Sequence, residues 1–288
     1  MTYENPEVPH EVNVSRESAL AEFLRLLAGI GIVVLAFAVL LYFTGAWLAR
    51  RLPIELEQAW VGEHVLGIAL QSSDAAEAAE VAAIETYLQR LANALAVHMP
   101  LPDGLRLHVH YTAHEQPNAF ATLGGHIVVT SALIEQLPSE NALAFVLAHE
   151  IAHLVARDPI AAVGGGLTIA AASTALSGDA SALLAPLTMV VQRGYSREAE
   201  SAADELAIAA LQDHYGHAGG GTALFQVFAS HREIAGHVLS DAQLPSLLAT
   251  HPADAERIAR ISAASAGWDP RRQPLRAIVI PGSASHSN

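Results

Sequence analysis

The sequence predicts a mainly helical protein with a small β-sheet, an α+β fold preceded by one N-terminal transmembrane helix. Three observations carry this prediction. An uncharged apolar run covers residues 26–49. Apolar residues recur at helical spacing in residues 73–98, and a helix start at Pro138-Ser139 precedes a window that is apolar on nearly every side. In residues 105–111, by contrast, apolar and polar side chains alternate, which is the period of a half-buried strand.

The composition excludes several classes of protein. The chain has 288 residues, of which 52% are hydrophobic, so it can bury a sizeable core and is not intrinsically disordered. A total of 15 Lys and Arg against 29 Asp and Glu gives a net charge of −14, which argues against a nucleic-acid partner. The chain has no cysteine, so any metal site must use imidazole and carboxylate groups. A mean hydropathy of +0.31 points to a membrane segment.

The apolar run at residues 26–49 is long enough to span a membrane. As a helix it extends roughly 36 Å, against about 30 Å for the hydrocarbon core of a bilayer. A buried core helix rarely runs this long without a polar face, and a signal peptide has a basic start, whereas residues 1–22 are rich in glutamate. We therefore expect a retained anchor that crosses the cell membrane once. Two arginines on each side of the run balance one another, so the positive-inside rule assigns no orientation.

The rest of the chain is expected to form one folded domain. The predicted divisions are an N-terminal tail at 1–25, the anchor at 26–49, a connector at 50–72, the domain at 73–268 and a C-terminal tail at 269–288. Helices are expected at 73–98, 138–157, 196–213, 222–239 and 252–264, and short strands at 105–111, 118–121 and 125–130. A second apolar region at 160–191 is broken at Ser177-Gly178-Asp179, and its arms are short for a membrane span. It favours a packed helical hairpin over a second membrane insertion.

The segment His149-Glu150-Ile151-Ala152-His153 has the spacing of a metal site on a helix. Side chains four residues apart project from one face, so both imidazoles can reach one ion while Glu150 points at the ion's open side. Zinc at this point would lower the pKa of a bound water towards about 7, and Glu150 could take the proton as the water attacks a peptide carbonyl. The alternative, a helix with two surface histidines, fits poorly, because the surrounding helix is apolar on nearly every side.

A catalytic zinc ion needs a third protein ligand and keeps its fourth position for water. Residues 195–205 offer several acidic side chains on one predicted helix. Glu200 and Asp204 share a face, so Glu200 could ligate the metal while Asp204 fixes the ring of a ligand histidine. The spacing alone does not select Glu200 over Glu198. Without the histidine motif, a solvated acidic face would be the better interpretation.

Taken together, these motifs resemble the HtpX-like and CAAX-prenyl-protease-like family of zinc metallopeptidases, which belong to the gluzincins. Two further segments extend the resemblance. Residues 118–121 and 124–130 resemble the strand segment ahead of the family's active helix, and Thr250-His251-Pro252 with Glu256-Arg257-Ile258 resembles its C-terminal signature. The four motifs occur in the family's order within residues 105–261. The resemblance implies a zincin-like metallopeptidase domain.

The resemblance also implies roles for single residues. It gives one zinc ion per chain, Glu150 as the general base, Asp204 as a support for the ligands, and as ligands His149, His153 and Glu200. His251 could steady the developing oxyanion, or occupy the metal's open position in a resting state.

A substrate-binding strand is the remaining site prediction. An exposed edge strand could pair its backbone with an extended substrate, and the residues expected in it are Gly125, His126, Ile127 and Val128. An ordinary core strand is the equal alternative. The membrane-embedded members of the family have four or more spans, whereas this sequence has one convincing span. The resemblance to the family therefore does not imply an intramembrane chamber or prenylated substrates for this protein.

The sequence as a whole predicts a membrane-anchored zinc endopeptidase. The resemblance implies a role in protein quality control, with unfolded or extended protein segments as substrates, beside the lipid bilayer that holds the anchor. A narrow processing protease is a second version of the same enzyme. The rival from another class is a membrane-tethered chaperone-like or scaffold protein whose metal is structural. The intact Glu150 argues against this rival, because a structural metal site needs no base there.

Overall fold

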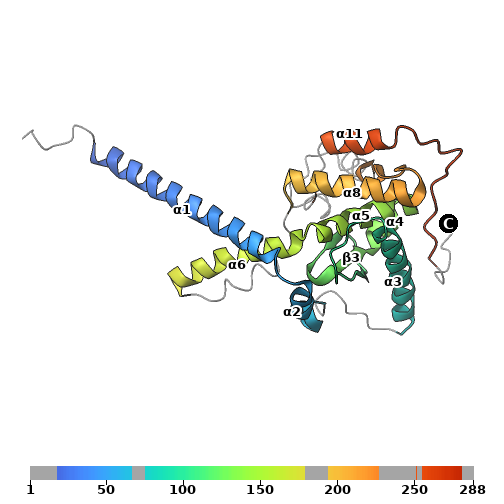
Figure 1. Cartoon of the computed structure of the whole chain (residues 1–288), viewed down its shortest axis with the longest axis horizontal. Helices are drawn as coiled ribbons and strands as arrows, with labels where there is room; N and C mark the ends of the chain where they lie inside the picture. Colours follow the sequence, from blue (N-terminus) through green and yellow to red (C-terminus); the bar gives the residue numbers. More distant parts are fainter. Residues whose placement is uncertain (1–17, 67–74, 179–193, 227–250, 252–254, 281–288) are drawn as a thin grey trace, which may run out of the picture.

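The fold is mostly helical around one small sheet, as the sequence predicts. The computed structural model describes residues 18–66, 75–178, 194–226, 251 and 255–280. Figure 1 shows a helical body that contains the sheet, and two long helices, α1 and α6, that extend from it on one side. Within these residues, the helices of at least six residues are α1 (Ala19–Ala49), α2 (Ile54–Leu66), α3 (Ala75–Ala96), α4 (Ser131–Gln136), α5 (Glu140–Val155), α6 (Asp158–Ser177), α8 (Arg197–Tyr215) and α11 (Ala255–Ala264).

Three predicted segments differ from the structure or lie largely outside the described residues. Helix α2 fills most of the segment that was expected to be a connector at residues 50–72. Its bounds could not be foreseen from a window that lacks a clear apolar stripe. Most of the helix expected at residues 222–239 lies outside the described residues, as does the second arm of the apolar region, at residues 180–191.

The sheet has three strands in the order β1-β3-β2, so β3 is its central strand. Strand β1 (His108–Thr112) pairs with β3 (His126–Thr130) in parallel, and β2 (Ala119–Ala121) pairs with β3 antiparallel. The expectation that residues 125–128 form an exposed edge strand is therefore wrong, because β3 has a main-chain partner on each side. The core-strand alternative holds, and Ile127 is completely buried. Strand β2 is an edge of the sheet and lies against α5.

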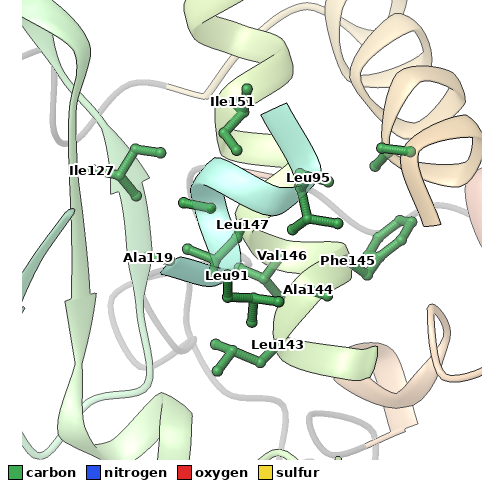
Figure 2. Packing of buried hydrophobic residues seen from close by; sticks show 14 of the residues in the cluster. Leu91, Leu95, Ala119, Ile127, Leu143, Ala144, Phe145, Val146, Leu147 and Ile151 are labelled. Atoms are coloured by element: carbon green, nitrogen blue, oxygen red, sulfur yellow. The ribbon is translucent and has the colours of Figure 1, made fainter. Parts of the chain in front are cut away.

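Helix α5 is the centre of the core. It begins at Ser139, whose hydroxyl accepts a hydrogen bond from the N–H of Ala142 at 3.2 Å and so satisfies one of the free donors of the first turn. Residues 141–154 are all buried, between α3, α8 and the sheet. Figure 2 shows side chains of α5 gathered with those of α3 and β3, among them Leu147, Leu91 and Ile127. The polar side chains of this helix are therefore held inside the protein.

Two helices in the described residues have the length and composition to cross a membrane. Helix α1 contains the predicted span at residues 26–49, and its most apolar window is not buried by the rest of the protein. Helix α6 passes the same test with lower hydropathy, and 28% of its window is buried. It forms the first arm of the apolar region at residues 160–191, which was expected to pack rather than insert. Because α6 is a second candidate, a single membrane crossing stays a prediction.

Helices α1 and α6 approach each other through glycines. A Cβ atom at Gly45 would lie 2.5 Å from the carbonyl oxygen of Gly164, which is closer than the Cβ atoms of real residues approach other heavy atoms. The hydroxyl of Thr168 in α6 lies within hydrogen-bond distance of two carbonyls, that of Leu41 in α1 at 2.9 Å and that of Gly165 in its own helix at 2.8 Å. Small residues that let two backbones meet, with a hydroxyl bonded across, are typical of helix pairs in membranes. This crossing fixes the position of the C-terminal end of α1 against the body.

Replacing Gly45 with valine is expected to destabilise the full-length protein by about 1–3 kcal/mol, because an overpacked contact must be relieved by moving backbone. The measurement is the midpoint of thermal unfolding in detergent micelles. The matched control is Gly31→Val in the same helix, where an added Cβ meets no atom within 4 Å. Equal midpoints for the two variants would contradict the close crossing.

Candidate metal centre

Helix α5 places His149 and His153 one turn apart on a buried face. Their Nε2 atoms are 3.2 Å apart, and their ring centroids are 4.8 Å apart. The exposed fractions are 4% and 0%, so the interpretation as surface histidines is wrong. The two imidazoles converge on one point inside the protein, which is the arrangement that the spacing of the motif predicts.

Helix α8 brings an acidic side chain to the same point. It begins at Ser196, whose hydroxyl accepts a hydrogen bond from the N–H of Ala199 at 3.2 Å. Glu200 in its first turn is buried, with Oε1 3.5 Å from Nε2 of His153 and Oε2 3.4 Å from Nε2 of His149. Glu198 is exposed. Burial therefore distinguishes Glu200, which lies at the metal group, from Glu198, whereas spacing alone did not.

Each of the two histidines has a carboxylate at its other ring nitrogen. The Nδ1 atom of His149 lies 3.1 Å from Oδ1 of Asp204, and Nδ1 of His153 lies 2.9 Å from Oδ2 of Asp158. The contact of His153 is a hydrogen bond, which holds that imidazole in one orientation and leaves its Nε2 for a metal, whereas the contact of His149 is a close charge pair. Asp204 was predicted in this position. Asp158 was not predicted as a partner of His153. Its position just after the motif, at the start of the next helix, could have indicated this role.

His251 completes the group. Its Nδ1 atom lies 2.8 Å from Oε1 of Glu200 and 3.3 Å from Nε2 of His149. One ligand atom from each of four buried residues lies within 4.8 Å of the others, and these residues are His149, His153, Glu200 and His251. Three imidazoles and one carboxylate are a donor set that suits a divalent transition metal such as zinc. The residues present therefore fit the metal that the motifs predict.

Glu150 lies between the metal group and the edge of the sheet. It is fully buried, and its Oε2 atom accepts a hydrogen bond from the N–H of Ala121 in β2, at 2.8 Å. Its Oε1 atom accepts no hydrogen bond from the described residues and lies 3.4 Å from Nε2 of His251. A buried carboxylate oxygen without a donor is costly, so the site is built for a further donor such as water. One oxygen is fixed and the other is presented to the centre.

The charges of the group depend on one another. Burial alone would lower the pKa of His149, but its contacts with Asp204 and Glu200 outweigh burial and raise that pKa to about 9. Burial likewise opposes the charge of Glu200, yet the three histidines around it hold its pKa well below the usual range. The raised pKa of His149 favours its protonated form when no metal is bound, and a metal ion must displace that proton.

Two further residues of the site were not predicted. Arg257 of α11 is buried, and its Nε and Nη2 atoms donate to the two carboxylate oxygens of Asp204 at 2.7 and 2.9 Å. Its Nη1 atom lies 2.6 Å from Oε2 of Glu200. The available signal was position, since Arg257 is one helical turn before the buried Ile261 and so falls on the apolar face of its helix. The other residue is Tyr195, whose ring stacks on His153 with centroids 4.0 Å apart.

The residues expected to bind substrate lie elsewhere. His126 stacks between His108 and His110, with ring centroids 4.8 and 5.0 Å away, and burial lowers its pKa to about 4. Ile127 and Val128 are buried in the sheet. None of the residues at 125–128 belongs to the metal group. The strand adjoining Glu150 is β2, not β3.

A buried helix with two histidines and a glutamate, facing a second glutamate from another helix, defines the site of a metallopeptidase. The comparison with known families agrees. The chain belongs to peptidase family M48, whose sequence profile matches residues 79–265, a range that includes the whole metal group. The resemblance that the motifs suggested is thereby confirmed.

Named relatives include proteases from several organisms. The chain is 30% identical over 230 residues to a protease HtpX homolog of Burkholderia mallei, over 67% of this chain and 78% of that protein. It is 29% identical over 196 residues to the mitochondrial metalloendopeptidase OMA1 of Schizosaccharomyces pombe, over 66% of this chain and 54% of that protein. It is 43% identical over 75 residues to the beta-barrel assembly-enhancing protease of Yersinia pestis, over 26% of this chain and 14% of that protein. The chain thus spans about half the length of the OMA1 relative and a smaller part of the last one.

Proposed function

We propose that this metallopeptidase is a membrane-anchored zinc endopeptidase that cleaves unfolded or extended protein segments. The observation that carries the proposal is the position of Glu150. Its carboxylate is fixed on one oxygen by Ala121 and turns the other towards a cluster of four metal-ligating groups. A metal site that served only structure would have no use for a buried acid held in this way.

The proposed ligands are His149, His153 and Glu200, with one zinc ion per chain. The ion would supply a Lewis acid that polarises the peptide carbonyl and lowers the pKa of water. Asp204 supports the site by holding Nδ1 of His149, and Arg257 neutralises the charge of Asp204. His251 lies close enough to the ligands to take the remaining position when no substrate is bound.

Glu150 is proposed to be the general base. Its Oε1 atom takes a proton from the attacking water and later delivers it to the leaving amine, which is the proton balance that peptide hydrolysis requires. The hydrogen bond from Ala121 to Oε2 keeps the carboxylate from rotating during this transfer. The Nε2 atom of His251 is on the same side of the site, 3.4 Å from Oε1, where it can donate to the oxyanion that forms on the carbonyl.

Strand β2 supports a preference for extended substrates. The N–H of Thr122 donates to the carbonyl of His126 at 2.8 Å, so by alternation Ala119 and Ala121 direct their main-chain groups away from β3. On that side, the N–H of Ala121 meets Glu150. A peptide added to this edge would pair with the outward main-chain groups of β2 that Glu150 does not engage, and it would be recognised by its backbone with little demand on its sequence. Such recognition suits unfolded segments and a role in protein quality control.

The membrane is the proposed location of the enzyme. Helix α1 supports this proposal, because its apolar side chains are exposed over a length that exceeds the hydrocarbon core. The catalytic unit is proposed to be residues 73–268, which contain the family match and the metal group. A topology reporter fused after residue 288 would show on which side of the cell membrane this unit lies.

The experiment that tests the proposed function is cleavage of casein by the full-length protein in detergent micelles. The protein as purified is expected to cleave casein. Cleavage should be lost after chelation and should recover when one equivalent of zinc is added back. Cleavage that survives complete removal of the metal would contradict the proposal.

The chaperone-like or scaffold alternative predicts a different pattern in the same assay. A protein of that kind would show equal, negligible cleavage for the wild type and for the Glu150→Gln variant, while still binding unfolded casein. A narrow processing protease would spare casein but hold its substrate in the Glu150→Gln variant, from which it can be recovered after cross-linking.

A further inference from the structure

The C-terminal end of the anchor helix touches the residues that orient the metal group. Arg50 follows the last residue of α1 and caps that helix. Its Nη2 atom donates to Oδ1 of Asp158 at 2.9 Å, and its Nε atom donates to the carbonyl of Ala156 at 3.3 Å. Ala156 is the cap of the active helix α5, and Asp158 is the first residue of α6. One side chain thus joins the anchor to the junction between these two helices.

Asp158 links Arg50 to the metal group. It is buried, and while Oδ1 accepts from Arg50, Oδ2 lies 2.9 Å from Nδ1 of His153. The two oxygens of one carboxylate are therefore engaged by the anchor on one side and by a proposed ligand on the other. Since Nδ1 of His153 is held, its Nε2 atom points at Glu200.

A second link ties the chain after the anchor to the same junction. Arg157 has a left-handed backbone conformation with φ 57°, which is unfavourable for a residue with a side chain. Its side chain donates to the carbonyl of Leu52 at 2.7 Å and to Glu57 at 2.6 Å. Glu57 in turn accepts from the N–H of Gly124 ahead of β3, at 2.8 Å. The turn between α5 and α6 is therefore held in place by the segment that follows the anchor.

We propose that Arg50 is a positioning residue for the metal site, acting through Asp158 on His153, so that the packing of the anchor helix sets the affinity for the metal. The inference rests on the proposed function in one respect, that His153 is a ligand. It adds that the C-terminal end of the anchor supports the metal group of the catalytic unit, besides holding that unit at the membrane. Because Arg50 is 48% exposed, its effect should be smaller than that of Asp158 itself.

The test is the zinc affinity of the full-length protein in detergent, measured by competition with a chromophoric chelator. Outer partners of a ligand histidine change metal affinity by about 10–100-fold, so Asp158→Asn should fall in that range. Arg50→Met should weaken zinc binding by about threefold to tenfold. Arg50→Lys, which keeps the charge but cannot make both contacts, should lie between Arg50→Met and the wild type.

The neighbouring arginine provides a matched control. Arg51 carries the same charge at the same end of α1, but it donates to the carbonyl of Trp47 and stacks on that ring, within its own helix. Arg51→Met should therefore bind zinc as the wild type does. The absorption spectrum of the cobalt-substituted protein is a second readout, and it should shift for Arg50→Met but not for Arg51→Met. Gly45→Val should weaken zinc binding in the same direction, whereas Gly31→Val should not.

The outcomes separate the inference from the proposed function. If His153→Ala keeps wild-type zinc affinity, the ligand assignment is wrong. If His153→Ala loses zinc while Arg50→Met matches Arg51→Met in affinity and in cobalt spectrum, only the role of Arg50 is overturned. Should Arg50→Met fail to fold, the comparison of Arg50→Lys with Arg51→Lys decides the question by the same two readouts.

Discussion

Replacing Glu150 with glutamine is expected to remove casein cleavage almost completely while leaving the metal in place. Glutamine has nearly the same shape, and its amide oxygen can still accept the hydrogen bond from Ala121. It cannot accept the proton of the attacking water. A general base contributes about 10²–10⁴-fold to a rate, so cleavage should fall by at least that factor. The measurement is the initial rate of casein cleavage beside the zinc content of the same sample.

A matched control for this substitution is Glu198→Gln on α8. Glu198 is exposed and lies two residues from a proposed ligand, so its replacement changes the net charge equally without touching the site. Its cleavage rate and zinc content should stay near those of the wild type. Substantial cleavage by Glu150→Gln with full zinc occupancy would show that another group acts as the base.

Replacing Arg257 with methionine is expected to cause the largest loss of stability among the site variants. The guanidinium is buried and neutralises two carboxylates, Asp204 and Glu200, through three short contacts. Removing one partner of a buried ion pair costs about 3–5 kcal/mol, because the other partner keeps its charge without compensation. The midpoint of thermal unfolding should fall accordingly. Zinc should be lost as well, since Asp204 no longer holds His149 in place.

The control for Arg257 lies on the same helix. Arg260 is three residues later, and it pairs with Glu256, which is largely exposed. Arg260→Met should change the unfolding midpoint little, because exposed ion pairs contribute about 0–1 kcal/mol. Equal midpoints for Arg257→Met and Arg260→Met would mean that the buried arginine does not hold the site together.

Much of the site was predictable from short-range spacing. His149, Glu150 and His153 are fixed relative to one another by one helical turn, and Asp204 follows Glu200 by another turn, so periodicity placed each set on one face. The helix that carries the motif was also predictable, because its apolar residues surround the polar ones. What spacing did not decide was the choice between Glu200 and Glu198. That choice follows from burial, which depends on how α8 packs against α5.

Two of the residues that were missed, Arg50 and Arg257, contact partners far away in the sequence, whereas Asp158 lies only five positions from His153. Arg50 reaches Asp158 across 108 positions, and Arg257 reaches Asp204 across 53. No local pattern reports such pairs, because an arginine near the end of an apolar run is expected to face the membrane surface. The edge strand was assigned wrongly for the same reason. Whether β3 is central or at an edge depends on its pairing with β1 and β2, and the alternation of side chains along one strand carries no information on this.

The most direct test of the central claim, that this protein is a zinc peptidase built on His149 and His153, is the metal content of the purified full-length chain. Elemental analysis by mass spectrometry should find one zinc ion per chain in the wild type and in the Glu150→Gln variant. It should find almost none in His149→Ala, which also cannot cleave casein. A wild-type protein without stoichiometric zinc that still cleaves casein in the presence of a chelator would contradict the account.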